Sequence, residues 1–116
     1  MSKSIKPYLK DIIQLADYLI NTFASKTRGD LYSDPTLQFA VSYVMQHIGE
    51  AANKIPDAFR QQHPQIQWRK IINLRHRLAH NYTGTSYSLI YDIIKESIPL
   101  LKNQVEEILK TLPEEN

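Results

Sequence analysis

The chain has 116 residues, of which 42% are apolar and 22% are charged, and its formal net charge is +2. These values indicate one soluble globular domain spanning residues 1–116, and they exclude a disordered chain. The absence of cysteine excludes disulfides, thiol catalysis and cysteine-bound metal. No apolar run approaches the roughly 20 residues of a membrane span, and the amino terminus lacks the apolar region of a signal peptide. We therefore expect a cytoplasmic protein with no membrane partner.

The amino-terminal quarter predicts one long amphipathic helix. Ser4 can cap this helix, and Pro7 is tolerated in its first turn, where backbone donors are unpaired. We expect the helix to end near residues 24–26, followed by a turn at Arg28-Gly29-Asp30. Its apolar residues recur at steps of four and three: Ile5, Leu9, Ile12, Ala16, Leu19 and Phe23.

A second long helix is predicted to start at Asp34-Pro35, an acidic N-cap followed by proline at the first helical position. Its apolar stripe consists of Leu37, Val41, Val44, Ile48, Ala51 and Ile55. A second row, Phe39, Tyr43, Gln46 and Glu50, lies roughly opposite this stripe. The row is either a surface for a partner or two scattered exposed aromatics with polar neighbours.

The second half predicts shorter helices separated by prolines. Pro56 ends the second helix, and residues 57–62 can form one further turn. A third helix is expected from about residues 66–68 to His80. A fourth starts near Ser86, is kinked or split by Pro99 and continues through Leu109, so that the core covers about residues 5–111 and the tail 112–116 frays. No segment alternates with period two, so we predict an all-α antiparallel bundle of four to five helices.

Positive charge is concentrated in one window of the sequence. Residues 58–91 contain no Asp or Glu but five cations: Arg60, Arg69, Lys70, Arg75 and Arg77. The stretch from Arg75 to Tyr82 adds two histidines, which titrate near neutral pH. A local cationic field of this kind suits a phosphate-bearing ligand, and nucleic acid is the first candidate.

The spacing within the third helix raises a geometric difficulty. Arg75 falls near the middle of the apolar face that contains Trp68, so its guanidinium needs either a carboxylate, such as Glu50, or an open cleft. His80 lies about 140° around the helix from Arg75. The two side chains can meet if the helix ends at Ala79 and the chain turns back, or if a second subunit supplies its own copy.

Each of these residues also has a purely structural interpretation. His80 can bond carbonyls at a helix end, Tyr82 can pack, and Trp68 is better explained as a core anchor than as a stacking platform. His76 and His80 have the spacing of a metal-ligand pair, but no carboxylate lies within the motif to complete a site. We therefore expect no metal and no cofactor.

The motif resembles the signature of the HEPN superfamily, and within it the HepT-like toxins. That signature is an arginine, a polar residue, three further positions, a histidine, any residue and a tyrosine. It corresponds here to Arg75, His76, His80 and Tyr82; relatives often have Asn or Asp at the position of His76. The flanks Trp68-Arg69-Lys70-Ile71-Ile72 and Ile48-Gly49-Glu50-Ala51 and the stretch from Asp92 to Pro99 also resemble this family, over roughly residues 8–109.

The resemblance implies a metal-independent endoribonuclease that is the toxin of a HepT/MntA-type two-gene module. It also implies a homodimer with the two motif helices in one cleft, and a nucleotidyltransferase antitoxin, MntA-like, that attaches AMP to Tyr82. Larger toxin–antitoxin complexes are compatible with this scheme. His80 would then be the general acid or base and Arg75 would bind the scissile phosphate, supported by His76, Tyr82 and Glu50.

The remaining cations of the motif region would attract the RNA backbone: Arg69, Lys70 and Arg77. Two rival functions remain open at this point. One is a catalytically silent HEPN-type module that scaffolds a nucleotidyltransferase. The other is a helical interaction domain with no nucleic-acid role.

Overall fold

The structure, a computed structural model, describes the backbone of residues 4–80 and 87–113, and the side chains of these residues except 75–80. Every regular element in this described part is a helix, which confirms the all-α prediction. The elements in chain order are α1 (Lys6–Thr22), α2 (Arg28–Ser33), α3 (Pro35–Lys54), α4 (Asp57–Gln61), α5 (Trp68–His80), α6 (Tyr87–Asp92), the π-helix η1 (Ile93–Ser97) and α7 (Ile98–Thr111).

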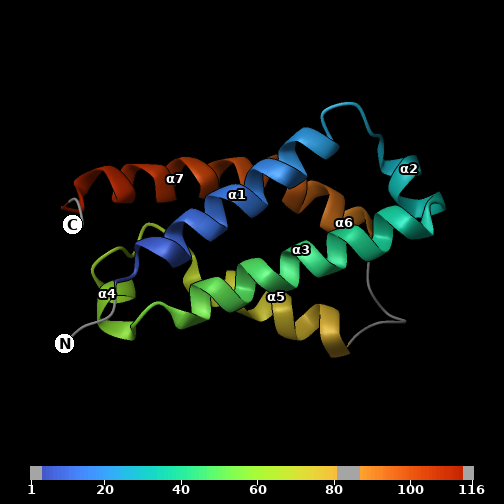
Figure 1. The fold of residues 1–116 in the computed structure, drawn as a ribbon. Helices are drawn as coiled ribbons and strands as arrows, with labels where there is room; N and C mark the ends of the chain where they lie inside the picture. Colours follow the sequence, from blue (N-terminus) through green and yellow to red (C-terminus); the bar gives the residue numbers. More distant parts are fainter. Residues whose placement is uncertain (1–3, 81–86, 114–116) are drawn as a thin grey trace.

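The long helices form an antiparallel bundle in which α1 and α3 are central (Figure 1). α1 packs between α7 and α3, and α5 packs on the other side of α3. The short helix α2 contacts both α3 and α6 at the end of the bundle remote from the chain termini. The helix α5 therefore depends chiefly on α3 for its position.

The apolar stripes of α1 and α3 build the core. Leu9, Ile12, Ala16, Leu19 and Phe23 are completely buried, as is Ile48 at the centre of the α3 stripe. α3 begins as predicted, because the Asp34 carboxylate accepts hydrogen bonds from the backbone N–H groups of Thr36 and Leu37. Ser4 is not the N-cap of α1; Ile5 holds that position, and the Ser4 hydroxyl accepts from the N–H of Lys6.

The predicted turn at residues 28–30 is wrong, because these residues open α2. Thr27 Oγ1 accepts a hydrogen bond from the Asp30 N–H over 3.1 Å, and an Asp30 carboxylate oxygen accepts one from the Thr27 N–H over 2.7 Å. This reciprocal capping box satisfies two backbone donors that would otherwise be unpaired. Leu31 is completely buried and fixes the short helix to the bundle.

The last helical segment is continuous from Tyr87 to Thr111, and Pro99 neither breaks it nor ends it. Proline has no N–H to donate to the carbonyl of Lys95, so the regular bonding pattern is lost there. The chain responds by widening into η1, in which the Ile98 N–H bonds the carbonyl of Ile93. Pro99 was predicted to kink or split this helix; the structure shows instead a continuous helix with a local π-helical segment.

No helix in residues 4–80 and 87–113 is long and apolar enough to cross a membrane.

Candidate functional site

The helix that bears the motif, α5, is anchored at its first residue. Trp68 is 7% exposed, and its indole Nε1 donates a hydrogen bond of 3.0 Å to the carbonyl oxygen of His63. Ile66, just before the helix, is also buried, and Ile71 and Ile72 pack against the core. Trp68 is therefore the core anchor predicted from the sequence, and it sets the start of α5.

The motif residues occupy the last turns of α5 and the chain beyond it. The side chains of Arg75, His76, Arg77 and His80, and all of Tyr82, lie outside the described residues. The helix runs to His80, which confirms the predicted end, and it does not end at Ala79 as one of the two routes for bringing Arg75 and His80 together required. On a regular helix, positions 75 and 80 are about 140° apart around the axis.

The cations nearer the start of α5 are described. Arg69 and Lys70 are exposed, as attraction of a polyanion requires. Arg60 differs, because its Nη2 lies 3.8 Å from the Asp57 carboxylate one helical turn earlier. Its charge is offset by an acid just outside the acid-free window, so the available positive charge is centred on α5 and not on α4.

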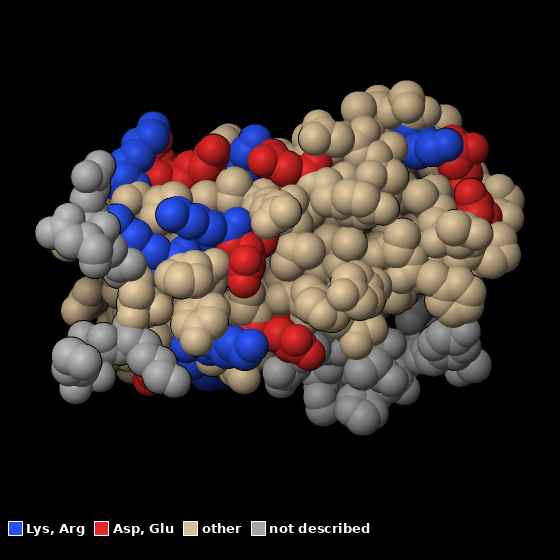
Figure 2. Space-filling view, in the orientation of Figure 1, with Lys and Arg blue, Asp and Glu red and all other residues tan. Residues whose placement is uncertain are grey.

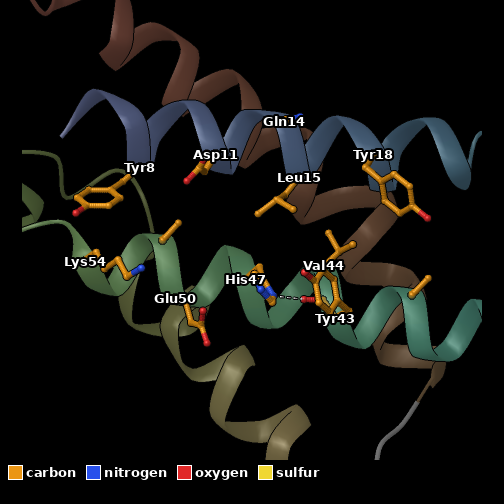
Figure 3. A pocket seen from close by; sticks show the side chains of 12 residues that line it. Tyr8, Asp11, Gln14, Leu15, Tyr18, Tyr43, Val44, His47, Glu50 and Lys54 are labelled. Atoms are coloured by element: carbon orange, nitrogen blue, oxygen red, sulfur yellow. Dashed lines mark hydrogen bonds between the residues drawn. The ribbon is translucent and has the colours of Figure 1, made fainter. Parts of the chain in front are cut away.

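Glu50 and Lys70 line two different grooves. Glu50 lies on α3 and borders a groove of about 600 Å³ between α1 and α3, together with Tyr8, Lys54 and His47. The Glu50 side chain points away from α1 in this view (Figure 3). Lys70 lines a groove of about 620 Å³ between α5 and the η1–α7 segment. The structure thus separates these two predicted site residues, and the alternative ion pair of Glu50 with Arg75 lies outside the described side chains.

The two aromatic residues of the second row of α3 are exposed, and a further exposed aromatic residue lies on the neighbouring helix α1. Phe39 and Tyr43 are each 62% exposed, and Tyr18 of α1 is 49% exposed. Residues 35–49 contain no Asp, Glu, Lys or Arg. Figure 2 shows a face that is free of charge over the middle of α3 and the end of α1, between charged side chains that gather on the left and a smaller charged group at the α2 end on the right. We call Tyr18, Phe39 and Tyr43 the aromatic surface.

Arg28 joins α2 to α6, and the sequence analysis did not identify it. Its Nη1 donates hydrogen bonds of 2.8 Å to the backbone carbonyl and to the hydroxyl of Ser88, and its Nη2 donates one of 2.8 Å to the Asp92 carboxylate. The guanidinium carbon also lies 4.7 Å from the centre of the Tyr91 ring. The hydrogen bond with Asp92 raises the pKa of Arg28. The only local signal was the capping box around it, because its partners are 60 or more residues away.

Comparison with known families gives a match to the family model described as ribonuclease HepT-like, over residues 5–108. The chain belongs to the HepT-like ribonuclease family. This finding confirms the resemblance drawn from the motif and its flanks, and with it the expectation of an enzyme of the ribonuclease class.

Individual relatives of this HepT-like chain match over nearly their whole length. A protein of Caldanaerobacter subterraneus subsp. tengcongensis whose assigned name is that of an RNase is 36% identical, over 93% of this chain and 96% of its own. A protein of Thermococcus cleftensis named "Probable ribonuclease HepT" is 34% identical over 95% of this chain and all of its own. No solved structure gives a comparable match.

Proposed function

We propose that this protein is the ribonuclease toxin of a two-gene toxin–antitoxin module, and that it cleaves RNA by acid–base catalysis at a cleft shared by two subunits. The observation that carries the proposal is the family match over residues 5–108 in a chain that retains Arg75, His80 and Tyr82 in the motif spacing. The cationic, acid-free window around the motif supports an RNA substrate.

The chemistry needs only the RNA and this chain's own side chains. A base removes the proton of the ribose 2′-hydroxyl, the 2′-oxygen attacks the adjacent phosphorus, and the bond from phosphorus to the 5′-oxygen breaks. The products are a 2′,3′-cyclic phosphate and a 5′-hydroxyl, which receives a proton from an acid. His80 acts as base or acid because imidazole titrates near neutral pH, and such transfer contributes about 10²–10⁴-fold. Arg75 binds the phosphate and stabilises the added negative charge, and His76 and Glu50 support these groups.

A second subunit would allow Arg75 and His80 to act on the same phosphate. Positions 75 and 80 face different sides of α5, so one helix does not direct both toward one phosphate. A second copy of α5 can contribute Arg75 from one chain and His80 from the other. The aromatic surface supports such a homodimer, because a charge-free exposed aromatic patch is typical of the buried centre of an interface.

Residues other than Arg75 and His80 attract the RNA, and another is the target through which the antitoxin neutralises the toxin. Arg69, Lys70 and Arg77 attract the backbone without reading sequence. Tyr82 contacts the phosphate or stacks on a base, and it is the residue that the nucleotidyltransferase antitoxin modifies. In that reaction the tyrosine oxygen attacks the α-phosphorus of ATP and pyrophosphate leaves. A bulky, negatively charged AMP group at this position would repel the RNA phosphate.

Inducible expression in a bacterial host, without antitoxin, tests the proposal. The wild-type protein should arrest growth and degrade cellular RNA, whereas His80→Ala should do neither. His63→Ala is the matched control. The His63 ring packs on Phe59, with ring centres 4.6 Å apart, and His63 precedes the motif helix, so this variant should remain toxic. Purified wild-type protein should cleave RNA in the presence of a chelator and should leave a strand with 2′-deoxy sugars intact.

The scaffold alternative predicts the opposite result. A catalytically silent module would allow normal growth of wild type and His80→Ala alike, and it would still bind its nucleotidyltransferase. Normal growth together with intact RNA in the purified assay would therefore replace the nuclease proposal with the scaffold.

A further inference from the structure

The groove of about 620 Å³ that Lys70 borders lies along one face of the motif helix. One of its walls is α5 and the other is the η1–α7 segment. α5 packs on α3 and α7 packs on α1, and the buried Ile48 of α3 lies at the base of the groove between them. At one end, Gln104 Nε2 donates a hydrogen bond of 2.9 Å to the carbonyl oxygen of Gln65, which ties α7 to the chain just before α5. The groove is therefore built from elements that the bundle holds in place.

The wall formed by α5 continues along the helix toward the motif. Lys70 and Asn73 line the groove, and α5 is helical from Trp68 to His80. Seven residues of a regular helix make almost two full turns, so position 77 lies about 20° around the axis from Lys70, and position 80 about 20° from Asn73. Each lies about 10 Å further along the axis. The groove and positions 77 and 80 of the motif thus share one side of α5.

The lining of the groove suits a flat ring with a polar edge. Leu74, Leu100 and Leu101 supply apolar surface, and Leu100 is 57% exposed. The hydrogen-bonding groups are amides, one cation and one acid, from Gln67, Asn73, Gln104, Lys70 and Glu96. Apolar walls with a few polar groups are typical of ligand sites. A nucleobase has the matching composition, because its faces are apolar and its edge carries donors and acceptors.

Glu96 is the only acid among the described residues that line this groove. It is exposed, and within the described part of the chain its carboxylate has no ion-pair or hydrogen-bond partner. An ionised carboxylate only accepts hydrogen bonds. Guanine presents two neighbouring donors on its pairing edge, N1–H and the 2-amino group, whereas adenine and cytosine present one amino group and uracil one N–H. The acid therefore favours guanine over the other RNA bases.

We propose that this groove is a subsite for one nucleobase of the RNA, within about three nucleotides of the bond that is cut, and that Glu96 makes the subsite select guanine. The spacing follows from the distance of about 10 Å between Asn73 and position 80, because stacked neighbours along a strand are about 3.4 Å apart. The inference rests on the proposed ribonuclease function. It deepens that function, since the cations of α5 attract the backbone without reading sequence and this groove reads a base.

The experiment compares the cuts that purified wild type, Glu96→Gln and Glu106→Gln make in a pool of single-stranded RNA of random sequence. Sequencing of the product ends records the bases around each cut. In wild type, guanine should be enriched at one fixed position within about three nucleotides of the cut bond. Glu106→Gln is the matched control, because Glu106 lines a different groove, between α1 and α7, and this variant should keep the enrichment.

Glu96→Gln replaces one acceptor oxygen by an amino group that opposes the donors of guanine. The preference is measured as the ratio of kcat/KM for two RNAs that differ only in guanine or adenine at the enriched position. This ratio should fall about ten- to a hundredfold in Glu96→Gln, as expected for the loss of a paired contact to a base edge. Cleavage of the adenine RNA should stay close to that of wild type, which separates base selection from a general loss of activity.

Leu100→Trp tests the groove without changing its charge. The indole fills the mouth of the groove, so KM for the guanine RNA should rise and the preference should shrink, while light scattering should show the same subunit assembly as wild type. The inference is overturned if wild type cuts RNA with no fixed base preference, or if Glu96→Gln keeps that preference. It is also overturned if Leu100→Trp dissociates a wild-type dimer, because the groove would then be covered by a second subunit. RNA left intact by wild type overturns the ribonuclease function itself, whereas cleavage without guanine enrichment removes only the subsite.

Discussion

The indole Nε1 of Trp68 donates its hydrogen to the carbonyl oxygen of His63, and the ring itself is almost entirely buried. This bond ties the first residue of the motif helix to the turn that follows α4. The start of the helix, which packs along α3, is therefore fixed by one side chain, about three turns before its last residue, His80.

Replacing Trp68 tests this anchor. Trp68→Phe removes the indole donor and part of the ring, and it should lower the free energy of unfolding by about 1–2 kcal/mol, since one hydrogen bond is worth about 1 kcal/mol and a small cavity adds to it. Urea denaturation followed by circular dichroism measures the change. Tyr18→Phe, at a side chain that is half exposed, should change it by less than about 0.5 kcal/mol. Equal values for the two variants would contradict the anchoring role.

The parts of the fold that the sequence predicted are those determined locally. Asp34-Pro35 starts α3 because the acidic side chain and the proline act within one turn, and the stripes of α1 and α3 follow from helical spacing. The turn predicted at residues 28–30 is wrong because the capping box formed by Thr27 and Asp30 starts a helix there, and this helix includes Gly29. That cap has its own signal, a threonine followed three residues later by an acid.

In the candidate site, too, the features that could be predicted are those formed by residues close together in the sequence. The motif and the cationic window were visible because their residues are close in sequence. The separation of Glu50 from Lys70 into two grooves, and the bonds of Arg28 to α6, depend on how distant segments pack. Arg28 meets Asp92 across 64 residues, and no pattern of residue types near Arg28 indicates that partner.

RNA binding should depend on salt through the exposed cations of α5. In a His80→Ala background, which prevents cleavage, Arg69→Gln and Lys70→Gln should each weaken binding and reduce the slope of log K against log salt by about 0.7–1. Fluorescence anisotropy with a single-stranded RNA at several salt concentrations measures this slope. Lys10→Gln, an exposed cation of α1, should leave the slope unchanged. An unchanged slope in both α5 variants would remove them from the RNA-binding surface.

Tyr82 should be the residue that receives AMP. Coexpression with the cognate nucleotidyltransferase should add adenylyl groups to the wild-type chain and abolish its toxicity, because the modified residue lies within the motif. Tyr82→Phe should gain no such mass by intact-protein mass spectrometry. Tyr43→Phe is the control, since Tyr43 is 62% exposed yet far from the motif in sequence, and it should be modified like wild type. Labelling that persists in Tyr82→Phe would place the modification elsewhere.

The aromatic surface should hold the two subunits together. A charge at its centre, Tyr43→Glu, should convert a dimer to a monomer, because a buried unpaired carboxylate in an apolar interface is costly. Light scattering coupled to size-exclusion chromatography reads the mass. Leu100→Glu places the same charge at an exposed leucine of the groove between α5 and α7, and the dimer should survive it. Dissociation by Leu100→Glu alone would move the interface to that groove.

The cap of α2 should make this helix sensitive to acid. Hydrogen bonds from the backbone N–H and then the hydroxyl of Thr27 lower the pKa of Asp30 below its ordinary value of 3.8. A carboxyl whose pKa is lower in the folded state stabilises the fold above the unfolded pKa, and this contribution disappears as the pH falls through the folded pKa. Asp30→Asn should therefore be less stable than wild type at neutral pH, and the difference should shrink as the pH falls below about 3.8. Thermal unfolding of both proteins across pH 2–7 measures the difference. Because α2 carries Arg28, the loss of stability of Asp30→Asn at neutral pH should also accelerate hydrogen exchange in residues 87–92. If the difference in stability between wild type and Asp30→Asn stays constant with pH, the Asp30 carboxylate is not the group that caps α2.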